Sequence, residues 1–289
     1  MKNSLQKSAA LFMAVIMVLT LFVTATFADG NENSGTCGEN LTWSYDSNTK
    51  TLTISGTGNM EDYSLGGGAG SVNLTTAPWK HLYNYAKTLV IEEGVTNIGD
   101  AAFLGFIELT SVTIPNTVTN IKWRALSCCT SLTKISIPGS VKNIGREAFF
   151  GSGLESITIP DSISDINAEA FCDCIWLKEV TIGKSVRLIG YKAFNNCHRM
   201  EKVAIPASVE MIDDYAFYGC SDLKDVYYDG ESIENIEIGD YNDCLLDAKW
   251  HFGNEDGSFI SMIKNFFADI GNSISEFFHS IIDFFGNLF

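Results

Sequence analysis

The chain has 289 residues, of which 46% are hydrophobic and 19% charged, and its formal net charge is −16 at pH 7. So acidic a chain repels phosphate backbones and anionic lipid headgroups, which argues against nucleic acid and against electrostatic membrane partners. Two explanations of the acidity stay open. One is solubility in water, and the other is attraction of a basic ligand or of cations, for which no calcium-loop spacing is present.

Residues 1–28 have the pattern of a secretory signal peptide. Two lysines form a positive n-region, residues 9–22 form an uncharged apolar stretch, and Thr26-Phe27-Ala28 places small residues at the positions that a signal peptidase reads. We therefore predict export and a mature chain that begins at Asp29. This chain has 17 basic and 35 acidic residues, a net charge of −18. An uncleaved membrane anchor is the competing interpretation of the same segment.

Residues 29–88 are predicted to form an N-terminal β cap. Within it, residues 41–54 alternate apolar and polar side chains on either side of Asp46-Ser47-Asn48-Thr49, which is typical of a hairpin. We expect this hairpin to cover an open sheet edge. Residues 64–77 are glycine-rich, but no Gly-Lys-Ser/Thr follows the glycines, so they do not form a phosphate-binding loop.

Residues 89–228 contain six copies of a 22–23-residue repeat. A repeated isoleucine occurs at Ile98, Ile121, Ile144, Ile166, Ile189 and Ile212. Five residues later, always after alanine, come Phe103, Leu126, Phe149, Phe171, Phe194 and Phe217. A leucine-like position follows at Leu109, Leu132, Leu154, Leu177, Met200 and Leu223. Internal repetition at such a period indicates a stacked repeat architecture.

An alternating triplet closes each unit and predicts a short strand with one buried face. The triplets are Val112-Thr113-Ile114, Ile135-Ser136-Ile137, Ile157-Thr158-Ile159, Val180-Thr181-Ile182 and Val203-Ala204-Ile205, and proline follows four of these five. Proline ends the strand in a turn. One unit buries too little apolar surface to offset its ordering entropy, so the copies must stack. We predict a solenoid of six coils, with a parallel β-sheet on one side. Turns and short helical pieces around the Ala-Phe pairs are expected on the other side.

The pattern Leu-x-x-Ile-x-Ile-Pro-x-Ser-Val-x-x-Ile-Gly-x-x-Ala-Phe, from Leu132 to Phe149, resembles the BspA-like leucine-rich repeat of bacterial surface proteins. Residues 37–79 and 226–252 resemble the flanking segments of Gram-positive members, so the resemblance covers about residues 37–252. It implies a leucine-rich-repeat solenoid. It also implies a secreted or surface-exposed adhesive protein, because family members are surface proteins with varied targets.

The C-terminal region is predicted in three parts: a cap over residues 229–252, a polar linker over 253–258 and an amphipathic, Phe-rich helix over 259–289. Apolar side chains three and four residues apart indicate the helix. No apolar run approaches ~20 residues, so the helix does not span a bilayer. Three roles stay open: packing on the solenoid, self-association, and interfacial attachment to membrane or wall. The shortage of Lys and Arg argues against the last role.

The sequence offers no catalytic constellation, metal site or cofactor motif. Its histidines lie far apart, without a second ligand at metal spacing, at His81, His198, His251 and His279. There is no Gly-x-Ser-x-Gly elbow, and no acid pair can be selected from the many carboxylates. We therefore predict that the protein is not an enzyme.

Eight cysteines raise the question of disulfides. One repeat position, three residues after the aromatic, holds Cys129, Cys174, Cys197 and Cys220. Phe106 fills this position in the first coil, so we predict buried packing thiols there. Cys37 and Cys244 belong to opposite caps, roughly 30 Å apart, whereas a disulfide needs Cα atoms within ~7 Å. No disulfide is expected. Cys128 and Cys172 are out of register, and their redox state stays open.

Two groups of residues are candidate contacts for a partner. On the outward strand face, two columns of side chains include Thr158, Thr181, Glu179 and Lys202. These columns either satisfy one another or contact a ligand. In a turn, coil four carries Ile175-Trp176 and coil five carries His198-Arg199, where other coils carry Thr130-Ser131 or Ser221-Asp222. Trp and Arg are typical of interface hot spots, and the alternative is that Arg199 simply covers the Trp176 ring.

These features predict a non-enzymatic binding or adhesion protein whose partner is an extracellular protein or matrix component. The alternative is a structural surface protein that self-associates through residues 259–289, which are also the only predicted route to membrane contact.

Overall fold

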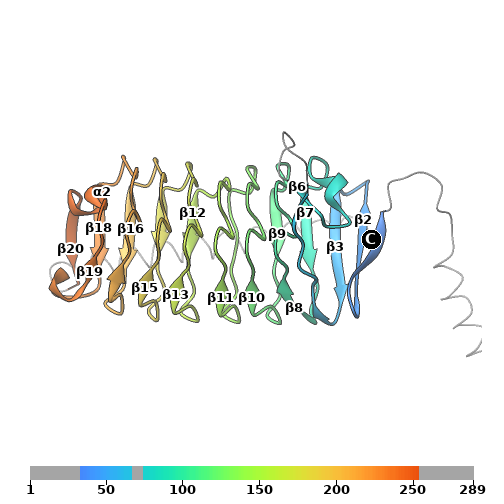
Figure 1. Ribbon diagram of the computed structural model, residues 1–289, viewed down its shortest axis with the longest axis horizontal. Helices are drawn as coiled ribbons and strands as arrows, with labels where there is room; N and C mark the ends of the chain where they lie inside the picture. The colour runs from blue at the N-terminus through green and yellow to red at the C-terminus, as the bar shows by residue number, and fades with distance from the viewer. Residues whose placement is uncertain (1–32, 67–73, 254–289) are drawn as a thin grey trace, which may run out of the picture. The chain divides into compact units, whose positions relative to one another are not determined.

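The computed structural model of the protein describes residues 33–66 and 74–253. These residues form successive coils, each with short strands joined by turns, that stack beside one another (Figure 1). The predicted leader (1–28), the predicted tail (259–289) and all but one residue of the predicted linker lie outside the described residues. Among the helices of the described ranges, none has the length and apolar character that a bilayer crossing requires.

The first strand of each coil carries the alternating triplet. These strands are β7 (Thr88–Ile91), β9 (Ser111–Thr113), β12 (Ser156–Thr158), β14 (Glu179–Thr181), β16 (Lys202–Ile205) and β18 (Asp225–Tyr228). Each pairs in parallel with its copy in the neighbouring coil, so that Val180 lies between Ile157 and Val203. These three side chains are buried because the alternation directs them to the core.

The repeated isoleucine ends a second strand in each coil, which has only two residues in every coil after the first. These strands are β8 (Val95–Ile98), β10 (Asn120–Ile121), β11 (Asn143–Ile144), β13 (Asp165–Ile166), β15 (Leu188–Ile189) and β17 (Met211–Ile212). They also pair in parallel, so the strands of the coils form two hydrogen-bonded ladders. The triplets alone had predicted only one ladder.

The prediction of short helical pieces around the Ala-Phe pairs is wrong. Two positions of this turn hold left-handed backbone in successive coils. The residue before the alanine is Ala101, Arg124, Glu147, Glu169, Lys192 or Tyr215, with φ between 49° and 59°. The second residue after the aromatic is Gly105, Cys128, Gly151, Asp173, Asn196 or Gly219. Left-handed residues cannot continue a right-handed helix.

The turn is instead bonded to the next coil through its backbone. The amide of Phe103 donates to the carbonyl of Ala125 (2.9 Å), and the amide of Phe149 donates to the carbonyl of Ala170 (2.9 Å). Because the same bond recurs from coil to coil, the turns form a third line of inter-coil hydrogen bonds beside the two sheets. This line satisfies backbone groups that a helix would otherwise pair internally.

The sheets are interrupted at the second predicted triplet, Ile135-Ser136-Ile137, which has no strand in the structure. On one side of the solenoid, a first sheet therefore ends at β9 and a second sheet begins at β12 and continues through β14, β16 and β18. The second ladder divides between β11 and β13. The break in the second ladder coincides with the 22-residue spacing from Ile144 to Ile166.

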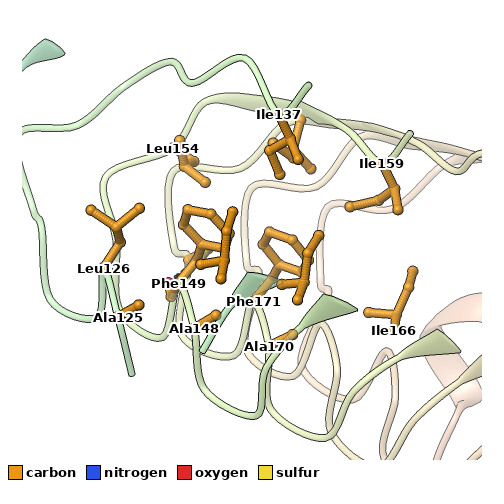
Figure 2. Packing of buried hydrophobic residues seen from close by; sticks show 14 of the residues in the cluster. Ala125, Leu126, Ile137, Ala148, Phe149, Leu154, Ile159, Ile166, Ala170 and Phe171 are labelled. Atoms are coloured by element: carbon orange, nitrogen blue, oxygen red, sulfur yellow. Dashed lines mark hydrogen bonds between the residues drawn. The ribbon is translucent and has the colours of Figure 1, made fainter. Parts of the chain in front are cut away.

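The core is a continuous line of identical apolar positions. The six repeated isoleucines and the six aromatic-position side chains are all fully buried. The rings of Phe149 and Phe171 stack with centroids 5.3 Å apart, and Phe194 continues the stack at 5.4 Å. Figure 2 shows Leu126, Phe149 and Phe171 in succession, each beside its preceding alanine. Stacking of equivalent positions, the basis of the predicted solenoid, is therefore confirmed.

The N-terminal segment closes the first coil with a hairpin. Strands β2 (Leu41–Asp46) and β3 (Thr51–Gly56) pair antiparallel, β1 (Ser34–Gly38) adds to β2, and β3 pairs in parallel with β7. Strand β4 (Gly58–Asn59) extends the second ladder at β8. The short strands β5 (Leu65–Gly66) and β6 (Leu74–Thr75) and the 3-10 helix η1 (Lys80–Leu82) complete this region.

Trp79 substitutes for the phenylalanine of a preceding coil. Its ring stacks on Phe103 with centroids 5.3 Å apart, and its indole Nε1 donates to the carbonyl of Ala102 (2.8 Å). The aromatic column therefore ends on a side chain that is fully buried and has its polar atom satisfied.

The C-terminal segment continues both ladders. The 3-10 helix η2 (Ile233–Asn235) and strand β19 (Glu237–Ile238) come first, followed by helix α2 (Asp243–Leu246) and strand β20 (Lys249–Phe252). Strand β19 pairs with β17, and β20 pairs with β18. The buried Asn242 side chain accepts the amide of Phe217 (3.0 Å), where the other coils offer an alanine carbonyl.

Candidate binding surface of the solenoid

The turn after the cysteine position brings Trp176 and Arg199 together. The Arg199 guanidinium carbon lies 4.1 Å from the centroid of the Trp176 ring. The indole remains 44% exposed, and the neighbouring Ile175 is also 44% exposed. A guanidinium over an indole face is a cation–π contact, which fixes the orientation of both side chains. We refer to Ile175, Trp176, His198 and Arg199 as the tryptophan turn.

Hydrogen bonds hold the tryptophan turn in place. The amide of Ile175 donates to the carbonyl of Asp173 (2.8 Å), and Nδ1 of His198 donates to the carbonyl of Gly219 (2.7 Å). The carbonyl of His198 accepts the amide of Asp222 in the following coil (3.1 Å). Its exposed apolar groups are therefore presented from a backbone that is fixed to the adjacent coils.

Two of the four candidate residues on the strand face form an ion pair with each other. Glu179 and Lys202 are register partners on β14 and β16, and their side chains form an ion pair at 2.5 Å. This hydrogen bond to Glu179 raises the pKa of Lys202. Thr158 is half-buried and Thr181 is only 8% exposed. Among these four candidates, the charged pair is therefore more accessible than Thr181.

A second exposed cluster was not predicted. We call it the tyrosine patch: Tyr191, Tyr215, Tyr218 and Tyr241. Tyr215 stacks on Tyr241 with centroids 4.2 Å apart and makes edge contacts with Tyr191 (5.9 Å) and Tyr218 (5.7 Å). The sequence did contain a signal for this patch. When the repeat is extended past residue 228, Tyr215 and Tyr241 fill the same position, the third residue after an isoleucine.

An ion network on the same turn column has a structural role. Glu147 is buried, with 4% of its side chain exposed, and it pairs with Arg124 and with Arg146 (3.1 Å). Arg146 also reaches Glu169 (2.9 Å). A buried carboxylate needs such partners, since removing its water costs several kcal/mol, and the two arginines supply them.

A family profile described as "BspA type Leucine rich repeat region" matches residues 81–153 and 142–249 in six copies, which together span more than half of the chain. The chain belongs to the BspA-type leucine-rich-repeat family. The resemblance inferred from the repeat is thereby confirmed. No curated protein matches the chain.

Solved leucine-rich-repeat structures are also similar to the chain. A protein from Bacteroides ovatus is 20% identical, covering 75% of this chain and 70% of its own, with a TM-score of 0.47. The T. pallidum leucine-rich-repeat protein is 22% identical, covering 65% and 90%, with a TM-score of 0.46. A leucine-rich cell surface protein from Faecalibacterium prausnitzii is 17% identical, covering 71% and 97%, with a TM-score of 0.26.

The cysteines of this leucine-rich repeat occupy a hydrogen-bonded slot. In the described residues all eight are free thiols. Each slot thiol donates to the carbonyl of the aromatic position in the preceding coils, as Cys174 does to Phe149 (3.2 Å) and Cys197 does to Phe171 (3.3 Å). A small thiol therefore suits the slot because it is both apolar and a weak donor.

Burial keeps several of these thiols protonated. It raises the pKa of Cys172 and of Cys174 to about 12, and the nearby carboxylates of Asp173 and Glu169 add to the effect at Cys172. The thiolate is the reactive form of cysteine, so Cys172 is not an activated nucleophile. Within residues 33–66 and 74–253, no three His, Cys, Asp or Glu side chains are grouped to hold a metal ion.

Proposed function

We propose that this chain is a non-enzymatic binding protein, exported to the bacterial surface or the medium, whose repeats present a contact surface to an extracellular protein or matrix component. The observation that supports this most is the tryptophan turn, where Trp176 is 44% exposed beneath the Arg199 guanidinium. Export rests on the predicted leader over residues 1–28.

The tryptophan turn has the composition of an interface and not of a core. Coils two and six carry Thr130-Ser131 and Ser221-Asp222 where coil four carries Ile175-Trp176. The repeat therefore folds without large apolar side chains at these two positions. Trp and Arg dominate the binding energy of many interfaces. A turn that is already ordered loses little further entropy when a partner binds.

The test compares a double variant with the parent protein. Trp176→Ala with Arg199→Ala should weaken binding to members of a panel of purified extracellular-matrix proteins at least about tenfold, measured by surface plasmon resonance. Its thermal unfolding should stay nearly unchanged, because both side chains lie outside the core.

Ile107→Ala is the matched control, since Ile107 is 39% exposed and fills the slot of Ile175 in the first coil. It should bind like the parent protein. Equal affinity of the double variant and the parent would reject the tryptophan turn as the contact surface. Binding to no panel member, together with absence of the protein from both the culture medium and the protease-accessible cell surface, would reject the function as a whole.

A further inference from the structure

The tyrosine patch lies on the turn column of the C-terminal coils. Tyr215 and Tyr241 fill the left-handed position of successive turns, with φ of 59° and 62°. Tyr191 precedes this position in coil five, and Tyr218 directly follows Phe217 in coil six. Three consecutive turns therefore bring four tyrosines to one place, although 50 residues separate the first from the last.

The fold does not require tyrosine at these positions. The left-handed slot holds alanine, arginine, glutamate or lysine in the other coils. Burial does not account for the rings either, because Tyr241 is 53% exposed, Tyr218 is 48% exposed and Tyr191 is 38% exposed. Clustered exposed aromatic rings mark interaction surfaces.

A cation already occupies part of the patch. The Lys192 ammonium lies 5.1 Å from the centroid of the Tyr191 ring and 5.6 Å from that of Tyr215. Its pKa is raised, first by a hydrogen bond with Tyr191 and also by the charge of Glu169. The tyrosine rings therefore present faces that attract a positive group.

The charges around the patch also favour a positive ligand. Asp213 and Asp214 directly precede Tyr215, and Asp240 directly precedes Tyr241. Asp214 accepts the amide of Asp240 (2.8 Å), which joins the two acidic turns. These three carboxylates adjoin the patch beside the single charge of the Lys192 ammonium, and the whole chain carries −16. An acidic aromatic surface is complementary to basic side chains.

We propose that the tyrosine patch binds a basic, arginine- or lysine-containing segment of a partner protein, with a cationic side chain on the rings and the aspartates around it. Lys192 then acts as an internal occupant that the incoming side chain displaces. The proposal extends the proposed binding function to a second surface and names the chemistry of the segment bound there.

The test uses the full chain and a fluorescein-labelled hexa-arginine peptide, followed by fluorescence anisotropy at physiological ionic strength. Tyr218→Ala with Tyr241→Ala should raise the Kd at least about tenfold. Because neither substitution changes the charge, nonspecific attraction to an acidic protein stays the same. Tyr85→Ala is the matched control, since Tyr85 is 59% exposed and lies outside the patch; it should bind like the parent.

Two further variants keep the test decisive if the double variant loosens the last coil. Tyr218→Phe with Tyr241→Phe keeps the rings and should retain the affinity within about twofold. Lys192→Gln removes the internal cation and should lower the Kd about two- to fivefold. Thermal unfolding by circular dichroism shows which variants are folded at the assay temperature.

Three results would overturn the proposal. One is equal affinity of the folded alanine variant and the parent protein, and another is weaker binding by Lys192→Gln. The third is saturable binding of a neutral oligosaccharide that the alanine variant loses, which would assign the rings to a sugar. The Trp176→Ala/Arg199→Ala variant should bind hexa-arginine like the parent. The proposal for the tyrosine patch can therefore fail while that for the tryptophan turn holds, and the reverse.

Discussion

In the turn around each Ala-Phe pair, two positions have the left-handed backbone conformation, which costs an L-residue other than glycine about 1–2 kcal/mol. Glycine escapes this cost, and aspartate and asparagine reduce it. The second position follows this preference, with glycine in three coils and Asp173 or Asn196 in two others. Cys128 is the exception, at φ 57°. The repeat tolerates such residues because hydrogen bonds to both neighbouring coils hold the turn.

Gly151→Ala should lower the free energy of unfolding by about 1 kcal/mol. Gly151 has φ 63°, and an added Cβ would meet only the Cys128 sulfur at 3.6 Å, so the cost comes from the backbone and not from crowding. Urea denaturation measures it. Gly139→Ala is the control, because Gly139 has open space and no positive φ. It should be neutral or slightly stabilising, and an equal loss in both variants would contradict the backbone explanation.

Thiol labelling should separate Cys128 from Cys172. With a pKa of about 12, raised chiefly by burial, Cys172 carries only roughly one thiolate in 10⁴ molecules at pH 8. Cys128 is half-buried. Iodoacetamide at pH 8 should therefore modify Cys128 in the folded protein and leave Cys172 intact until denaturant is added, as peptide mass analysis would show. Equal labelling rates in the folded protein would contradict the buried state of Cys172.

Each inner coil is held by hydrogen bonds and ring contacts to the coils on both sides. The terminal coils lack one of these neighbours, so other residues must supply the missing contacts. At the N-terminal end, Trp79 supplies the ring that stacks on Phe103. At the C-terminal end, Asn242 supplies the acceptor for Phe217 and donates its own amide to the carbonyls of Asp213 (3.0 Å) and Gly239 (2.9 Å). A solenoid requires such caps because its last coil has no following copy.

Asn242→Ala should lower the free energy of unfolding by about 1–3 kcal/mol, because a buried amide and two carbonyls lose their partner. Thermal and urea denaturation would measure the loss. Hydrogen exchange should also accelerate at Phe217. Asn235→Ala, at an exposed position in η2, is the control and should change little. An Asn242→Ala variant as stable as this control would show that the cap does not depend on the side-chain amide.

At the scale of the whole molecule, the line of turns continues where the sheets stop. The amide of Leu126 donates to the carbonyl of Ala148 (2.9 Å), and that of Phe149 donates to Ala170 (2.9 Å), on both sides of the strandless triplet at 135–137. The aliphatic column is equally continuous. Cohesion between the two sheet segments therefore rests on the turns and the core more than on strand pairing.

Hydrogen exchange should reveal this division. Amides of residues 135–137 should exchange faster than those of residues 180–182, because the latter triplet contributes to a strand with partners on both sides. Exchange followed by mass spectrometry would measure the difference. The amides of Leu126 and Phe149 serve as the internal control and should stay protected. Equal protection of the two triplets would contradict the interruption.

Much of the architecture followed from the repeat alone. Spacings of 22 and 23 residues between Ile98 and Ile212 predicted stacked coils, because equivalent apolar positions must align to form one core. The left-handed turns were not predictable in this way: Arg124, Glu147 and Lys192 give no local signal for positive φ, which the bonds to adjacent coils impose. Trp176 and Arg199 were predicted as neighbours because both depart from the repeat in consecutive coils.

The sequence by itself determined the family, the repeat length, the buried positions and the contact between Trp176 and Arg199, since each follows from periodicity along one chain. The tertiary structure alone decided the second ladder, the strandless triplet, the contacts by which Trp79 and Asn242 close the end coils, and the tyrosine patch. These depend on which backbone groups and side chains meet across coils, and the tyrosines of the patch meet only because three turns stack in register.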